Sequence, residues 1–122
     1  MCCPLGCLVV AALRHAGAAE VVACDLHAMP LRIATEVGAT ATARADRPDD
    51  LGNVAVTREL ELRGSFRFDT EFDEALSLLA QGLPVDPVVT HTFPLEASVA
   101  AFETARDRTV ASKVLLDLSD RA

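Results

Sequence analysis

Residues Met1–Ala12 read MCCPLGCLVVAA, and an apolar stretch, Glu20–Cys24 (EVVAC), follows them and ends at Asp25. This order predicts a turn, a helix, a strand and an acidic residue at the end of that strand. A turn that enters a helix, followed by a strand that ends in a carboxylate, is typical of the front of a βαβ unit. The stretch therefore predicts an α/β fold with a parallel sheet and flanking helices.

The opening turn matches the dinucleotide-binding pattern G-x-G-x-x-G at one of its three glycines. Met1, Cys3 and Gly6 stand at the glycine positions, so only the last glycine is kept. In such units the pyrophosphate lies at the helix N-terminus, and an acid about 20 residues later binds the ribose. Asp25 stands where that acid is expected. The pattern predicts a truncated, Rossmann-like dinucleotide-binding domain.

Each residue of this candidate site has an ordinary structural alternative. Pro4, Leu5 and Gly6 would turn the backbone beneath a pyrophosphate, or would simply begin a helix. Asp25 would bind the adenosine ribose, or would cap the next helix, which is worth about 1 kcal/mol of stability. The side chain of Cys3 stands where bare backbone should approach the phosphate, so we expect NAD binding to be weak or lost.

The composition indicates one cytoplasmic domain or part of one. The chain has 122 residues, of which 51% are hydrophobic, and a net charge of -7. An acidic surface repels polyanions, so we expect no nucleic-acid partner. No apolar run approaches the roughly 18 residues of a membrane helix, so no membrane association is expected. Cys2, Cys3, Cys7 and Cys24 show no repeated C-x-x-C pattern and are expected to be reduced, buried thiols.

The rest of the chain alternates helical and extended patterns. The predicted helices cover 6–17, Ala28–Val37, Thr70–Gln81 and a last segment that Pro94 opens. The predicted strands cover 20–24, 39–43, 55–66, 85–92 and Lys113–Leu118. Glycines are expected to end three helices, at Gly17, Gly38 and Gly82. Two apolar stripes at helical spacing are expected to be core: Phe72/Leu76/Leu79 and Leu95/Val99/Phe102.

Several stretches resemble a known family. Pro4–Leu8 (PLGCL), Cys24-Asp25 and Glu36–Thr40 (EVGAT) resemble the coenzyme domain of the zinc-type medium-chain dehydrogenases. Arg58–Phe68 (RELELRGSFRF) and Thr90–Leu95 (THTFPL) are similar to the polyol branch of that family, as are Ala101-Phe102-Glu103 and Ser112–Leu116. The resemblance covers nearly the whole chain and implies the C-terminal part of such an enzyme.

The resemblance implies a division into three segments. Residues 1–53 would be the N-terminal half of the Rossmann coenzyme-binding domain, 54–83 its last strand and helix, and 84–122 a segment that returns to the catalytic domain. The zinc-holding catalytic domain is expected to be absent, together with strands one, four and five of the coenzyme domain. His15, His27 and His91 have no flanking ligand pattern, so zinc ligands are expected to be absent.

The resemblance also implies contacts near residues 65–68. Phe66 and Arg67 would contact the nicotinamide end of NAD, and Arg67 and Phe68 the polyol. The alternative for Arg67 is a solvated arginine at a strand end. No catalytic and no metal-binding residue is assigned in this chain.

The function implied by descent is hydride transfer from a secondary alcohol of a polyol or sugar acid to NAD, with the chain inactive alone. The alternatives are a non-catalytic interaction module, which pairs with itself or with an intact homologue, and a gene remnant. Strand edges without partners, and apolar faces at Val88, Val89, Val114 and Leu116, predict a homo-oligomer or an aggregation-prone chain. The resemblance adds dimerisation through the strand near Arg63–Phe66.

Overall fold

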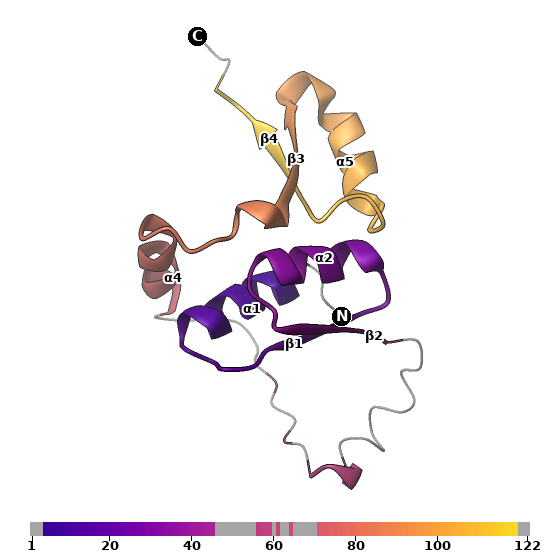
Figure 1. Cartoon of the computed structure of the whole chain (residues 1–122). Helices are drawn as coiled ribbons and strands as arrows, with labels where there is room; N and C mark the ends of the chain where they lie inside the picture. Colours follow the sequence, from indigo (N-terminus) through magenta and orange to yellow (C-terminus); the bar gives the residue numbers. More distant parts are fainter. Residues whose placement is uncertain (1–3, 46–55, 60, 62–63, 65–70, 120–122) are drawn as a thin grey trace.

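The computed structural model describes residues 4–45, 56–59, 61, 64 and 71–119 of the chain. Helices and strands alternate through these residues (Figure 1). The first unit contains α1 (Pro4–His15), β1 (Val22–Asp25), α2 (Ala28–Glu36) and β2 (Ala41–Arg44). Helix α4 (Glu71–Ala80) leads to the second unit, which contains β3 (Val89–Pro94), α5 (Ser98–Arg106) and β4 (Lys113–Asp117). Short 3₁₀ helices precede β3 and α5, namely η1 (Asp86–Val88) and η2 (Leu95–Ala97).

Both pairs of strands are parallel, as predicted. Strand β1 pairs with β2 from Val22↔Ala41 to Asp25↔Arg44. Strand β3 pairs with β4, with an irregularity in β3 between Val89 and His91. In each unit a helix connects the two parallel strands, which is the connection that parallel pairing requires. The described residues therefore form two βαβ units with two two-stranded sheets rather than one continuous sheet.

The three predicted glycine stops are confirmed. At the end of α1, Gly17 N–H donates to Arg14 O and Ala18 N–H to Leu13 O; equivalent pairs of bonds close α2 at Gly38 and α4 at Gly82. This double closure is the Schellman arrangement, and it needs a positive φ at the glycine. No described helix is both long enough and apolar enough to cross a membrane.

One apolar cluster holds the first unit together. Helix α2 contacts both strands of the first sheet, and α1 packs beside α2. The cluster consists of Cys7, Val10, Ala11, Val21, Ala23, Ile33, Ala34, Val37 and Val88. Val88 belongs to η1, so it ties the start of the second unit to the core of the first. Its expected exposure was wrong, because it is 3% exposed.

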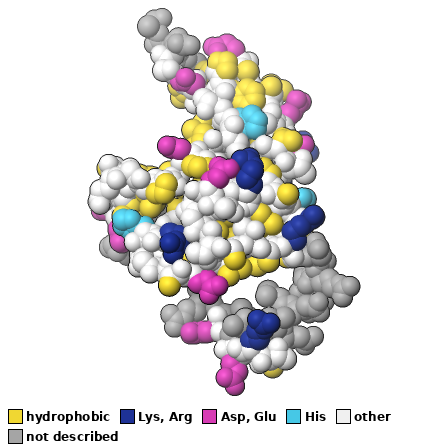
Figure 2. Space-filling view, in the orientation of Figure 1, with side chains coloured by type: hydrophobic (Ala, Val, Ile, Leu, Met, Phe, Trp, Pro, Cys, Tyr) yellow, Lys and Arg dark blue, Asp and Glu magenta, His cyan; other side chains and the backbone are white. Residues whose placement is uncertain are grey.

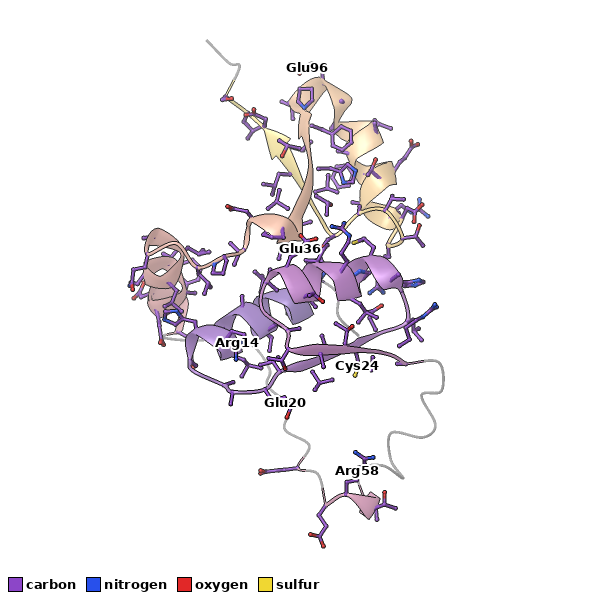
Figure 3. All side chains as sticks on the ribbon, in the orientation of Figure 1. Arg14, Glu20, Cys24, Glu36, Arg58 and Glu96 are labelled. Carbon is purple, nitrogen blue, oxygen red and sulfur yellow. The ribbon has the colours of Figure 1, made fainter. Side chains whose placement is uncertain are left out.

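Strand β1 is covered on one face only. Val21, Ala23 and Asp25 are buried, whereas Val22 and Cys24 are exposed. Figure 3 shows Cys24 on the side of the strand away from helices α1 and α2. The expectation that Cys24 is a buried thiol was therefore wrong, while Cys7 is buried as predicted.

The two apolar stripes are not core. Phe72, Leu76 and Leu79 of α4 are each about half exposed, and α4 has no buried residue. Val99 and Phe102 are more exposed still, and Leu95 is half-buried. Helical spacing predicts an apolar face, but it does not supply a surface that covers the face. Figure 2 shows the resulting apolar patches among the polar side chains on the face that it draws.

The predicted strand over 55–66 is wrong where it can be checked. Val56 and Thr57 are helical, and Arg58 and Glu59 form a turn. Glu59 has a φ of 52°, which lies in the left-handed region that extended strands do not enter. The remainder of that segment lies largely outside the described residues, and so does all of residues 65–70.

Gly38→Ala should lower the free energy of unfolding by more than Gly17→Ala. Both glycines have positive φ, at 116° and 86°, so both substitutions cost about 1 kcal/mol in backbone strain. A Cβ at Gly38 would also lie 2.8 Å from Arg14 Cγ, whereas one at Gly17 meets nothing within 4 Å. Overpacking adds about 1 kcal/mol or more at Gly38.

Urea denaturation of the two variants measures this difference. Equal losses of stability in the two alanine variants would mean that Arg14 moves aside without cost and that the Gly38 site is not overpacked.

Candidate functional site

Asp25 is the last residue of β1 and the one buried charged side chain among the described residues. It is 1% exposed. Its Cα is paired with that of Arg44 at the end of β2, and its backbone carbonyl accepts a hydrogen bond of 3.1 Å from the Ala45 N–H. Strand pairing therefore fixes the backbone at the carboxyl end of both strands, which is the edge where open parallel sheets bind ligands.

The two carboxylate oxygens of Asp25 differ in their hydrogen bonding. Oδ1 accepts a bond of 2.9 Å from the His27 backbone N–H. Oδ2 is buried and has no hydrogen-bond partner among the described residues. Buried polar atoms in folded proteins are nearly always paired, because an unpaired one costs about 1–3 kcal/mol in lost solvation. An unpaired buried oxygen at the ligand edge of a sheet indicates an acceptor held for a bound hydroxyl or amine.

The capping alternative for Asp25 does not hold in its simple form. The residue at the N-cap position of α2 is His27, with extended backbone angles and no side-chain cap bond. Asp25 bonds the N–H of that residue, so it shapes the turn between β1 and α2. Its negative charge also lies before the N-terminus of α2, where the helix dipole favours an anion.

The start of α1 lies near the same edge. Pro4, Leu5 and Gly6 form the first turn of the helix. Cys7 Sγ contacts the carbonyl oxygen of Pro30, in the first turn of α2, at 3.7 Å. The first turns of α1 and α2 are thus neighbours. Gly6 lines a groove together with Cys24, the residue before Asp25, so the start of α1 lies on the same side of the unit as the end of β1.

A groove runs between α1 and β1 from this edge. It has a volume of about 290 Å³ and is lined by Gly6, Val9, Val10 and Leu13 of α1, by Val21 just before β1, and by Val22, Ala23 and Cys24 of β1. We call it the α1–β1 groove. The sequence pattern did not reveal it, because apolar spacing does not show where two elements leave a gap between them.

The remaining predicted site residues do not join this group. Phe66, Arg67 and Phe68 lie outside the described residues. His15 and His27 are exposed; His91 is half-buried, with Nδ1 3.0 Å from Thr90 Oγ1. No three His, Cys, Asp or Glu side chains gather as a metal-ligand group among the described residues. These residues therefore offer no ligand set for the zinc that the resemblance implies.

Asp117 makes the same type of turn as Asp25, in which Oδ1 accepts from the backbone N–H two residues later, but neither of its carboxylate oxygens is buried. Its Oδ1 accepts bonds from the Ser119 backbone N–H at 2.9 Å and from Ser119 Oγ at 2.6 Å. The hydroxyl bond, followed by the backbone bond, lowers the pKa of the Asp117 carboxyl below its usual value. This carboxylate is solvent-exposed, so it provides a natural control for Asp25.

The chain is similar in sequence to polyol dehydrogenases, although no family model matches it. It is 29% identical over 164 residues to L-idonate 5-dehydrogenase (NAD(P)(+)) of Escherichia coli strain K12, covering 93% of this chain and 47% of the relative. It is 46% identical over 63 residues to mouse sorbitol dehydrogenase, covering 51% of this chain and 17% of that protein. The chain thus spans about half the length, or less, of these curated relatives.

Two solved dehydrogenase structures also match the chain. The crystal structure of L-idonate 5-dehydrogenase from E. coli K-12 matches with a TM-score of 0.78 and 26% identity, over 96% of this chain and 48% of that one. An alcohol dehydrogenase from E. coli CFT073, complexed with NADH, matches with a TM-score of 0.71. At 16% identity it shows the fold alone. The Rossmann-type fold and the resemblance to the polyol branch are confirmed.

The alignment with L-idonate 5-dehydrogenase is longer than the part of this chain that it covers. It extends over 164 residues, whereas 93% of a 122-residue chain is fewer residues than that. The relative therefore has residues within the aligned region that have no counterpart here. This agrees with the internal gap that the sequence pattern predicts in the coenzyme domain.

Replacing Asp25 should show whether its main role is structural. We expect Asp25→Ala to leave the free energy of unfolding within about 1 kcal/mol of the parent. The lost bond to the His27 N–H is offset because a buried, unpaired oxygen is removed with it. Urea denaturation measures the change.

A loss of about 2 kcal/mol or more would instead make Asp25 chiefly a structural residue. Asp117→Ala removes the same type of turn at an exposed position and controls for the turn itself.

Proposed function

We propose that this homologue of L-idonate 5-dehydrogenase and sorbitol dehydrogenase, which are zinc-type medium-chain dehydrogenases, provides the adenosine-binding part of an NAD-linked polyol dehydrogenase. The reaction would be hydride transfer from a secondary alcohol of a polyol or sugar acid to NAD. The part assigned to the described residues is coenzyme binding, and none of them is assigned a catalytic role.

The observation that carries this proposal is the unpaired Oδ2 of Asp25. A ribose offers two neighbouring hydroxyl groups, and a carboxylate at the end of the second strand accepts hydrogen bonds from them in Rossmann folds. Oδ1 is already bonded to the His27 N–H, so Oδ2 is the acceptor that remains for the sugar. The bond would satisfy an oxygen that otherwise remains buried at a cost.

The same carboxylate predicts a preference for NAD over NADP. NADP carries a phosphate on the ribose 2′ oxygen, in place of a hydroxyl that could donate to Asp25. A phosphate dianion beside a carboxylate is repelled, and burial strengthens the repulsion because screening by water is reduced. Arg44 is paired with Asp25 at the ends of the two strands. Its Nη2 donates to the Leu26 carbonyl oxygen at 3.1 Å, so we do not assign this guanidinium to a 2′ phosphate.

The affinity should nevertheless be low. Because Oδ2 is shielded from solvent, a ribose reaches it only after a local rearrangement, whose cost reduces the affinity. The first turn of α1 would receive the pyrophosphate through the backbone N–H groups of Leu5 and Gly6. The side chain of Cys3 would crowd the phosphate at that turn. A dissociation constant of about 1 mM is expected.

Titration of the ¹⁵N-labelled chain with NAD and NADP, followed by NMR, tests the proposal. NAD should shift the backbone amide signals of Leu26 and His27 and bind about tenfold more tightly than NADP, a difference of about 1.4 kcal/mol. Asp25→Asn should abolish these shifts, because it replaces an acceptor oxygen with a donor NH₂. Asp117→Asn, with the same type of turn at an exposed site, should bind NAD as the parent does.

Binding that survives Asp25→Asn, or equal affinities for NAD and NADP, would contradict the assignment of the ribose to Asp25.

A further inference from the structure

The outer edge of β1 has no partner strand among the described residues. Thr40 N–H donates to the Val21 carbonyl at 2.9 Å, and Ala45 N–H to the Asp25 carbonyl, so the odd-numbered residues of β1 direct their backbone polar groups toward β2. Backbone groups alternate along a strand. Val22 and Cys24 therefore direct their N–H and C=O groups toward the opposite edge, where no described strand lies.

Helix α1 is placed to cover a strand at that edge. In a βαβ unit the connecting helix lies over the strands that it joins, as α2 does over β1 and β2. Helix α1 packs beside α2, and the α1–β1 groove lies between α1 and β1. All of its lining side chains are uncharged, and the exposed ones include Val9 and Leu13. The shape and chemistry of the groove fit an apolar strand that hydrogen-bonds to β1.

The chain contains a strand with matching properties. Strand β4 reads KVLLD, with Val114, Leu115 and Leu116 in succession. A continuous apolar run is typical of a parallel strand that is covered on both faces. Yet Leu115 and Leu116 are exposed, and β4 pairs along one edge only, with β3, within the described ranges.

We propose that the α1–β1 groove receives β4 of a second copy of this chain. Figure 1 shows α1 and α2 lying between the first sheet and β4 of the same copy, so that strand has to come from another molecule. A parallel alignment, like that of both strand pairs in the structure, brings Lys113 at the start of β4 beside Glu20, which precedes β1. The opposite charges favour this register. The interface joins two different surfaces, so each copy has one acceptor groove and one donor strand.

Hydrogen exchange of β1 amides measures the pairing directly. At about 1 mM chain, an interface of this small size should be substantially occupied. The amides of Val22 and Cys24 should then exchange at least about tenfold more slowly than at about 20 μM. The amide of Ala23 points toward β2 and should show no comparable change. This readout requires no coenzyme, so it is independent of the proposed NAD binding.

Two charge variants block the two sides of the interface. Leu13→Lys places a cation in the acceptor groove, and Leu116→Lys places one on the face of the donor strand that this register turns toward the groove. Each should abolish concentration-dependent protection and leave the chain monomeric in analytical ultracentrifugation. Leu8→Lys is the matched control: Leu8 lies on the same helix with 40% exposure, against 44% for Leu13, but it lies outside the α1–β1 groove. It should associate as the parent does.

Mixing the two blocked variants gives the sharpest result. The Leu116→Lys copy keeps a working groove, and the Leu13→Lys copy keeps a working strand, so a mixture should restore one interface. Protection of Val22 and Cys24 should return only in isotope-labelled Leu116→Lys chain. Monomeric behaviour of the parent at 1 mM, association in which Val22 and Cys24 still exchange rapidly, or association unaffected by Leu13→Lys would each overturn the proposal.

Discussion

The structure depends on one constraint, the packing of α2 across the β1–β2 pair. Ile33 and Ala34 of α2 and Val37 at its C-cap are almost completely buried, and Val10 and Ala11 of α1 extend the same cluster. Removing apolar surface from water at about 25 cal/mol per Å² is the dominant favourable contribution in a domain of this size. Because Val88 of η1 also enters the cluster, the start of the second unit packs against the core of the first.

This narrow core explains both the site and the open surfaces. The β1–β2 pairing fixes the backbone on either side of Asp25, so its carboxylate is held at the ligand edge with one oxygen bonded and one unpaired. Within the described part of the chain, this core covers one face of β1, and β2 pairs with one of its edges. Large apolar side chains of α1, α4, α5 and β4 remain exposed, among them Val9, Phe72 and Phe102. A carboxylate suited to a ribose and a groove suited to a strand both follow from one half-covered sheet.

Local signals in the sequence predicted local structure well. Pro30 near the start of α2 and Gly38 after its end identified that helix, and Asp25 was placed correctly at the end of its strand. Burial could not be predicted in this way, because it depends on which elements meet. The stripe that includes Phe72 was expected to be core but is exposed, and Cys24 was expected to be buried but faces away from the helices. The unpaired state of Asp25 Oδ2 depends on the β1–α2 turn, which sequence spacing does not specify.

The role proposed for Asp25 Oδ2 is to accept a hydrogen bond from a coenzyme hydroxyl group. A crystal structure of the chain soaked with NAD at high concentration would show this bond. A ribose hydroxyl oxygen should lie within about 2.5–3.0 Å of Oδ2, with Oδ1 still accepting from the His27 N–H. NAD bound elsewhere, or a ribose that contacts only solvent while Oδ2 stays unpaired, would contradict it.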